Sequence, residues 1–142
     1  MAKKIRIAES FENVYVWGIS TALSELRLVL HINKQLHIDL RRSINVMNRI
    51  SLPPEGFQTF TCVIEKYDLP VRYILFVNRS NGHTLFTGCS TFDYLLVLMG
   101  SFSSHELKRT TTLLRTIEGI NALMVINIET LKQDKEYFLL FD

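Results

Sequence analysis

Two short, uninterrupted apolar runs constrain the fold of this chain more than any other feature of its sequence. The first covers residues 73–77 (Tyr-Ile-Leu-Phe-Val), and the second lies within a segment from Phe92 to Met99 that Gly100 follows. Runs of this length are too short for a buried helix and lack the alternation of a strand with one wet face. The sequence therefore predicts two central strands, the first of them buried on both faces.

A strand followed by a helix is expected in the first quarter of the chain. Residues 12–18 alternate as a strand does, and apolar residues then follow helical spacing from Ser20 to about Leu36. Ser20 or Thr21 is the expected N-cap of this helix. Glu25 would lie in its first turn, where a carboxylate interacts favourably with the helix dipole.

A second helix is predicted after the second apolar run. Ser103 and Glu106 have the spacing of a capping box, in which each side chain satisfies a backbone N–H of the other residue. Gly119 is expected to adopt the left-handed conformation that ends many helices. The apolar face of this helix would consist of Leu107, Thr110, Leu114 and Ile117.

The remaining segments complete an α+β fold. The first apolar run lies in a strand predicted at 71–78, and further strands are expected at residues 38–44, 57–65, 122–128 and 137–141. A hairpin connection is expected at 66–70, an irregular segment at 85–91 and a helical stub at 129–135. This order predicts a mixed or mostly antiparallel sheet of about five to seven strands with two helices. A chain of 142 residues without a long linker predicts a single domain, residues 1–142.

The sequence carries no predicted export or membrane-spanning segment. Glu9 and Glu12 lie where a signal peptide would have its apolar core. The strongest apolar run is far shorter than the roughly 18 residues that span a bilayer. We expect a cytoplasmic protein with no membrane partner, in which Cys62 and Cys89 stay reduced.

Positive charge is concentrated in the first third of a chain whose net charge is only +2. Such a patch is compatible with nucleic-acid binding, but the interpretation we favour is a solvated strand edge kept soluble by basic side chains. The patch consists of Lys3, Lys4, Arg6, Arg41, Arg42 and Arg49, with Lys34 nearby in sequence.

Patterns of common catalytic and cofactor sites are absent from the sequence. The four histidines and two cysteines lack metal-ligand spacing, and the glycines form no phosphate-binding loop, so we expect no metal or cofactor. Cys89, in a predicted loop, would be a nucleophile if it were exposed beside a histidine, and otherwise an inert core residue. Asp93, between Phe92 and Tyr94, would be a general acid or base, or alternatively a loop cap or an ion-pair partner.

Several segments together resemble the IPExxVD family of small bacterial proteins of unknown function. The similar segments are Gly18–Leu23, Leu26–Leu28, Ile32–Leu40, Phe76–Asn78, Asp93–Leu96, Ile117–Ile120 and Ile128–Lys132. The motif that names the family falls on residues 87–93, where Asp93 matches and Cys89 occupies the position of the glutamate. The resemblance implies a cytoplasmic bacterial protein with no established catalytic residue or cofactor.

The polar positions within these similar segments form a candidate functional cluster. An alternative is that they are structural, with Arg27 paired to a carboxylate such as Asp93 and Asn33 capping the end of the first helix. The cluster consists of Arg27, Asn33, Lys34, Asn78 and Asp93.

These observations favour a non-enzymatic protein-interaction or regulatory module. Its expected partner is another protein or a second copy of the chain. One alternative is a nucleic-acid-binding accessory protein that uses the basic patch. Another is a small-ligand-binding or enzymatic domain around Asp93.

Overall fold

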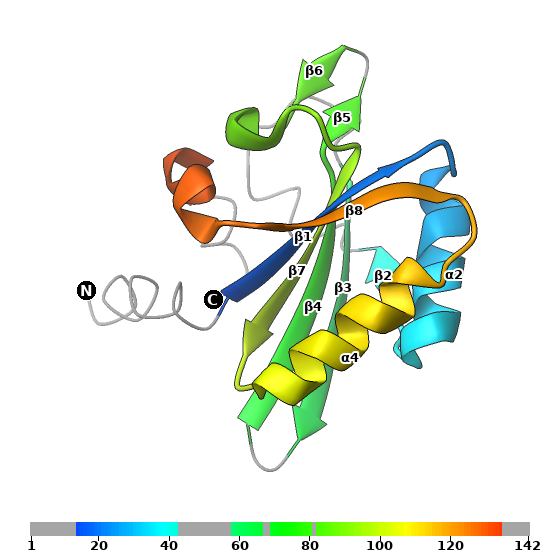
Figure 1. The fold of residues 1–142 in the computed structure, drawn as a ribbon, viewed down its shortest axis with the longest axis vertical. Helices are drawn as coiled ribbons and strands as arrows, with labels where there is room; N and C mark the ends of the chain where they lie inside the picture. The colour runs from blue at the N-terminus through cyan, green and yellow to red at the C-terminus, as the bar shows by residue number, and fades with distance from the viewer. Residues whose placement is uncertain (1–13, 43–57, 67–68, 81, 135–142) are drawn as a thin grey trace.

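A computed structural model describes residues 14–42, 58–66, 69–80 and 82–134, and the structural statements below concern these residues. They form a six-stranded antiparallel sheet in the order β2-β3-β4-β7-β1-β8, with two α-helices (Figure 1). The predicted α+β class is therefore confirmed. The sheet strands are β1 (Val14–Thr21), β2 (Arg41–Arg42), β3 (Thr59–Lys66), β4 (Leu69–Val77), β7 (Tyr94–Gly100) and β8 (Ile120–Ile126). The other elements are the helices α2 (Glu25–Leu36) and α4 (Ser104–Arg115), the small hairpin β5 (Arg79–Ser80) and β6 (His83–Thr84), and the 3₁₀ segments η2 (Thr87–Cys89) and η3 (Ile128–Asp134).

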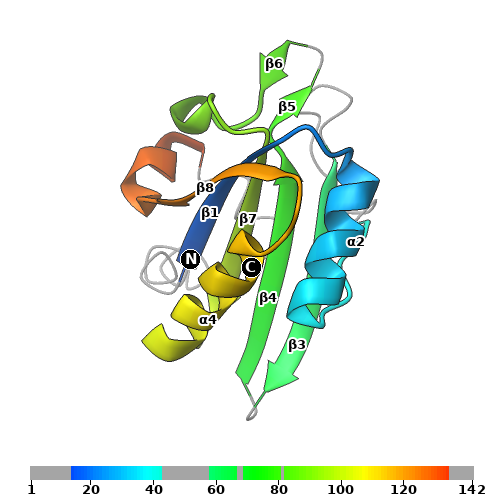
Figure 2. The same cartoon turned by 45° about the vertical axis from the view of Figure 1, so that its right-hand side comes forward.

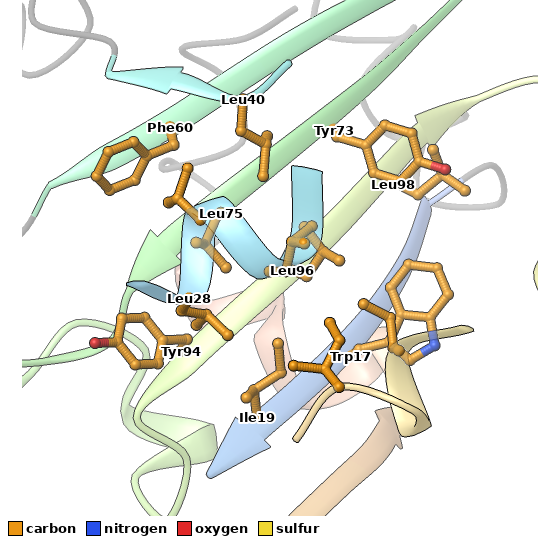
Figure 3. Packing of buried hydrophobic residues seen from close by; sticks show 14 of the residues in the cluster. Trp17, Ile19, Leu28, Leu40, Phe60, Tyr73, Leu75, Tyr94, Leu96 and Leu98 are labelled. Atoms are coloured by element: carbon orange, nitrogen blue, oxygen red, sulfur yellow. The ribbon is translucent and has the colours of Figure 1, made fainter. Parts of the chain in front are cut away.

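Both helices cover the same face of the sheet, which we call the helix face (Figure 2). Trp17, Leu75 and Leu96 lie side by side on neighbouring strands of this face, and Leu28 of α2 packs into the same core (Figure 3). The indole Nε1 of Trp17 donates to Thr111 Oγ1 of α4 at 2.9 Å. The helices thus pack on the sheet through apolar side chains, and the partly buried Trp17–Thr111 hydrogen bond adds a polar contact to α4.

The opposite face, which we call the loop face, carries a second apolar cluster. Ile74 and Phe76 of β4 belong to it, together with Phe86 and Cys89 near η2 and Leu131 of η3. Every residue from 73 to 77 is buried, because alternate side chains of β4 enter the two clusters. The prediction that this run is a strand buried on both faces is confirmed, and the second run forms the equally central β7.

The first helix begins later than its sequence pattern suggests. Its N-cap is Ser24, whose side chain accepts a hydrogen bond from the backbone N–H of Arg27. The predicted N-caps, Ser20 and Thr21, are wrong because β1 continues through both residues, paired with β8. The extended pairing of β1 therefore delays the start of the helix.

The second helix begins with the predicted capping box but ends earlier than predicted. Ser103 Oγ accepts from the backbone N–H of Glu106, and Glu106 Oε1 accepts from the backbone N–H of Ser103. The helix ends at Thr116 in a right-handed conformation, so Gly119 is not its cap. Gly119 does adopt a positive φ of 101°, in the turn that enters β8.

The connection between β3 and β4 is shorter than predicted. The β3–β4 pairing continues to Lys66 and Leu69, which leaves only residues 67 and 68 between the strands. Pro70 belongs to β4, and it is tolerated there because the pairing of β4 with β7 begins only at Val71. Of the strand predicted at 38–44, residues 38–42 are described, and only Arg41 and Arg42 form a strand, β2, so the prediction is wrong for residues 38–40. The strand predicted at 137–141 lies outside the described residues.

Candidate functional site

Asn78 and Asp93, two members of the candidate polar cluster, are joined by a backbone hydrogen bond. The backbone N–H of Asn78 donates to the carbonyl of Asp93 at 2.9 Å. The fully buried Asn78 side chain donates to the carbonyls of Cys89 and Phe92, and it accepts from the N–H of Phe86. This amide thus organises the loop that runs from β6 to β7.

The carboxylate of Asp93 holds the end of β1. Its Oδ2 accepts from the backbone N–H of Thr21 at 3.0 Å, and its Oδ1 lies 3.7 Å from Nη1 of Arg79. The suggested pairing with Arg27 is therefore wrong, because the described ion pair of Asp93 is with Arg79. The side chain of Asp93 is 34% exposed and that of Arg79 is 54% exposed, so this ion pair contributes little stability.

The other three members of the cluster lie on α2, away from this junction. Arg27 and Lys34 are exposed. Asn33 organises the end of the helix, since its carbonyl accepts from the N–H groups of His37 and Ile38. Its side chain also bridges both backbone groups of Leu40, at 2.8 Å to the N–H and 3.3 Å to the carbonyl. The cap of α2 is His37, and the Asn33 side chain binds Leu40 beyond the helix, so the expected capping role of Asn33 is wrong. Among the described residues, no hydrogen bond or ion pair joins these three residues to Asn78 or Asp93.

Cys89 does not have the exposure that a nucleophile would need. It is buried in the loop-face cluster, and its Sγ lies 3.9 Å from Thr130 Oγ1 of η3. The neighbouring Gly88 packs so closely against η3 that a Cβ there would collide with the carbonyl oxygen of Thr130. The exposed-thiol interpretation is therefore wrong, and this segment serves the packing of η2 on η3.

Only two residues of the predicted basic patch fall within the described residues. Arg41 and Arg42 make up β2, one edge of the sheet, and both are exposed. Arg41 Nε lies 2.7 Å from Asp39 Oδ2, so part of its charge is offset locally. This arrangement is typical of a sheet edge protected by charge. Lys3, Lys4, Arg6 and Arg49 lie outside the described residues.

The opposite edge of the sheet, β8, has no such protection. Its sequence, Ile-Asn-Ala-Leu-Met-Val-Ile, contains neither a charged residue nor a proline. Met124 is 56% exposed and Val125 is 47% exposed. Their partners on β1 are Gly18 and Trp17, so the two side chains project from opposite faces of the sheet.

Among the described residues, β8 is the last strand of the sheet, and no described strand pairs with the backbone N–H and C=O groups on its outer side. We call this surface the β8 edge. Sequence reasoning missed it because a strand becomes an edge only through the strand order. The available signal was the lack of charge over seven consecutive strand residues.

A groove of about 320 Å³ opens on the helix face between α2, α4 and the sheet. Ile64, Val71 and Tyr73 of the sheet line it, together with Leu36 at the end of α2 and Leu113 of α4. Its polar lining includes His37, Glu106 and Arg109, but neither Asp93 nor Cys89. The groove is therefore separate from Asp93 and Cys89, the two residues that the sequence suggested as catalytic candidates.

The environment of Tyr94 perturbs its acidity. Burial raises the pKa of Tyr94 above its ordinary value of 10.0, and the carboxylates of Glu25 and Asp93 add to this effect. The phenol donates a hydrogen bond to the carbonyl of Leu23 at 3.1 Å. Tyr94 therefore remains a neutral hydrogen-bond donor that links β7 to the chain entering α2.

The described residues contain neither a cluster of metal ligands nor a membrane-spanning helix. No group of three or more His, Cys, Asp or Glu side chains is placed to hold a metal ion. Neither described α-helix combines the length and the apolar character needed to cross a bilayer.

Comparison with known proteins gave no match: no protein-family model, curated protein or solved structure is significantly similar to this chain.

Proposed function

We propose that this protein is a non-enzymatic protein-interaction module that binds its partner by strand addition at the β8 edge. One observation carries the proposal: the strand at this edge lacks charge and proline, yet exposes apolar side chains on both faces. Strand addition is an established mode of protein recognition, in which main-chain hydrogen bonds supply affinity and alternate side chains supply specificity.

The physical gain from an added strand has two parts. The outer N–H and C=O groups of β8 would exchange water for a regular ladder of hydrogen bonds, each with a net contribution of about 1 kcal/mol. Neighbouring side chains of the added strand would cover part of the exposed surface of Met124 and Val125, and each Å² of apolar surface removed from water contributes about 25 cal/mol. A partner segment of about seven residues would therefore gain affinity both from main-chain hydrogen bonds and from the burial of apolar surface.

The alternatives from sequence have weaker support. Nucleic-acid binding would depend on a patch of which only Arg41 and Arg42 are described, and Arg41 is already paired with Asp39. A site around Asp93 would depend on a carboxylate that already accepts from Thr21 and pairs with Arg79. We therefore retain protein interaction as the proposed function.

We also propose that the chain is a divergent member of the IPExxVD family and acts in the cytoplasm of a bacterium. The support is the set of similar segments, two of which meet in the fold through the Asn78–Asp93 backbone bond. Cell fractionation with an antibody against the protein tests the location. Recovery with the membrane or the extracellular fraction would contradict it.

The test of the proposed function compares partner capture by three tagged forms of the full chain. The wild-type protein and the control variant Val63→Lys should capture the same proteins from a lysate of the native cells. Val63 is 50% exposed on β3, so it matches Met124 in exposure but lies away from the β8 edge. Met124→Lys should lose these proteins, because a lysine there places a charge at the paired edge. Capture unaffected by Met124→Lys would refute the proposal.

A further inference from the structure

We propose that the groove on the helix face binds a small amphipathic carboxylate, a molecule with an apolar body and one carboxylate head. We call it the helix-face groove, and its volume of about 320 Å³ lies at the lower end of the range for small-molecule sites, about 300–1,000 Å³. Its floor belongs to β3 and β4, and β7 and β1 separate these strands from β8. The site is therefore independent of strand addition at the β8 edge.

The helix-face groove forms where the helices leave one end of the β3–β4 hairpin uncovered (Figure 2). Gln35 Nε2 donates to Thr116 Oγ1, and this contact holds the C-terminal ends of α2 and α4 together. Ile64 of β3 and Val71 of β4 are cross-strand partners on the helix face, and both line the groove. An apolar ligand would therefore lie on this pair of side chains, with a helix on either side.

The walls of the helix-face groove are apolar as well. Leu36, the last residue of α2, and Leu113 of α4 line it from the two helices. Both are partly buried, as is Ile64, so each side chain keeps apolar surface that a ligand would remove from water. The hydrophobic effect would therefore hold the body of the ligand, with contributions from three elements of the fold.

Arg109 gives the rim of the helix-face groove a positive charge. It is exposed, lines the groove and forms no ion pair with any described carboxylate. The acidic residue of the lining, Glu106, is held at the start of α4, where its Oε1 accepts from the backbone N–H of Ser103 at 3.2 Å and from its hydroxyl at 3.3 Å. A guanidinium presents paired N–H donors that match the two oxygens of a carboxylate. The rim therefore favours a ligand with a carboxylate head.

His37 provides a second polar group at the helix-face groove. Among the described residues it is the only non-glycine residue with a positive φ, 56°, and it is the C-cap of α2. Glycine is the usual residue in such a left-handed cap, because it avoids the steric cost of a Cβ. A histidine at this position instead lines the groove with an imidazole, whose ring N–H can donate to a carboxylate. The strained backbone is therefore consistent with a binding role for this side chain.

NMR titration of the isotope-labelled full chain tests the site with octanoate, 1-octanol and octylammonium, which have apolar chains of equal length. Octanoate should shift the backbone amide signals of Ile64, Val71 and Leu113 with a Kd of about 1 mM. The other two probes should bind about three- to fivefold more weakly, because they cannot pair with Arg109. Octanoate that shifts none of these signals, as in a groove already filled by another part of the chain, would overturn the proposal. Octylammonium that binds as tightly as octanoate would overturn it too.

Two neighbouring residues of α4 test the carboxylate head. Arg109→Gln should weaken octanoate binding about three- to fivefold and leave 1-octanol binding unchanged. Lys108→Gln removes the same charge from an exposed residue that is not part of the lining, so it should bind octanoate as the wild type does. Equal weakening by both changes would show a general effect of charge and overturn the role of Arg109.

Two neighbouring residues of β3 test the apolar floor. Ile64→Gln should weaken octanoate binding about five- to tenfold, because it replaces apolar contact surface by an amide. Val63 is 50% exposed and its side chain points to the other face of the sheet, so Val63→Gln should have no effect. Thermal unfolding checks that both variants are folded. If Ile64→Gln is not, the comparison of Arg109→Gln with Lys108→Gln decides.

His37→Gly separates binding from stability. The melting temperature should not fall, because glycine accepts the left-handed conformation without strain, while octanoate binding should weaken about two- to threefold. Unchanged binding would show that His37 is not part of the site. Met124→Lys should bind octanoate as the wild type does, since Met124 lies on β8. Loss of octanoate binding and loss of lysate capture are therefore distinguishable outcomes.

Discussion

The two edges of the six-stranded sheet, β2 and β8, end the same structure in opposite ways. β2 consists of two exposed arginines, whereas β8 extends over seven residues without a charge. Each is nevertheless fixed by a polar side chain close to its start. Asn33 binds both backbone groups of Leu40, directly before β2, and Thr21 Oγ1 donates to the carbonyl of Gly119, directly before β8.

This comparison separates two properties of an edge strand that are easily confused. Attachment to the sheet depends on hydrogen bonds to residues inside the fold, and each edge has a side-chain anchor of this kind. Availability to a partner depends on the charge, length and apolar character of the outer surface, and here they differ. Changes to the anchors should therefore alter stability, and changes to the outer side chains should alter association.

The largest effect on stability is expected from the anchor of β2. Asn33→Ala removes both hydrogen bonds to Leu40 and should lower the free energy of unfolding by about 2–3 kcal/mol. Asn33→Asp retains the acceptor for the Leu40 N–H and should cost about half as much. Urea unfolding monitored by circular dichroism measures both values. The exposed neighbour Lys34→Ala is the control, and a cost of Asn33→Ala no larger than that of this control would contradict the assigned role.

The anchor of β8 should have a somewhat smaller effect. Thr21→Val keeps the shape of a buried side chain but removes the bond to Gly119 and the acceptor for the N–H of Leu23. We expect a loss of about 1–2 kcal/mol in the same urea experiment, because two partly buried backbone groups lose a partner. Thr21→Ser, which keeps the hydroxyl, should restore most of the stability. If Thr21→Ser is as destabilising as Thr21→Val, the prediction is contradicted, because the retained hydroxyl would then not restore stability.

Tyr94, on the central strand β7, provides a reference for the two edges. Its contribution to the free energy of unfolding should depend on pH and should not change when an edge is altered. Because the pKa of Tyr94 is raised in the folded state, the folded protein keeps this proton to a higher pH than the unfolded chain. The contribution to stability is complete below about pH 10 and is lost as pH rises from there through the raised pKa.

Tyr94→Phe removes this pH dependence, together with the bond to the Leu23 carbonyl, which contributes about 1 kcal/mol at neutral pH. Unfolding free energies measured near neutral pH and above about pH 10 for both proteins test the sign. A decline at high pH that is the same in wild type and Tyr94→Phe would show that other groups cause it. Variants of Asn33 should keep the wild-type decline.

The smallest effect on stability is expected at the outer surface of β2. The double change Arg41→Val and Arg42→Val removes exposed charges and one exposed ion pair, so the free energy of unfolding should change by less than about 0.5 kcal/mol. Its consequence should appear in light scattering, as species larger than those of the wild-type protein. A lysine variant of the same positions retains the charge and should behave as wild type. Unchanged association of the valine variant would show that length, rather than charge, protects this edge.

The fold was predictable where local sequence and tertiary environment agree. All five residues of the run at 73–77 are apolar, so the sequence of this segment alone predicts that both faces of the strand are buried. The Ser103–Glu106 capping box is likewise complete within four residues. For these elements the local sequence is sufficient to predict the structure.

Features that depend on distant partners were not predictable in the same way. Ser20 and Thr21 are good N-cap residues, but pairing with β8 keeps both in a strand and moves the cap to Ser24. Asp93 was singled out correctly as a polar residue with a partner, whereas its partner Arg79 follows from the placement of the β5–β6 hairpin. The β8 edge depends on strand order, and strand order is not encoded in any one segment.

The position of β1 between β7 and β8 has a consequence for the synthesis of the chain. β1 is the first described strand, yet its partners are residues 94–99 and 120–126. At about 5–20 residues per second, a ribosome needs roughly 5–20 s to make the hundred or so residues that separate β1 from the end of β8. Until β7 (Tyr94–Gly100) has been made, Val16, Trp17 and Ile19 have no partner strand, and the second partner, β8, is made only after α4. Insertion of β1 between two late strands is therefore expected to limit the folding rate, and the nascent chain presents a binding segment for chaperones until it occurs.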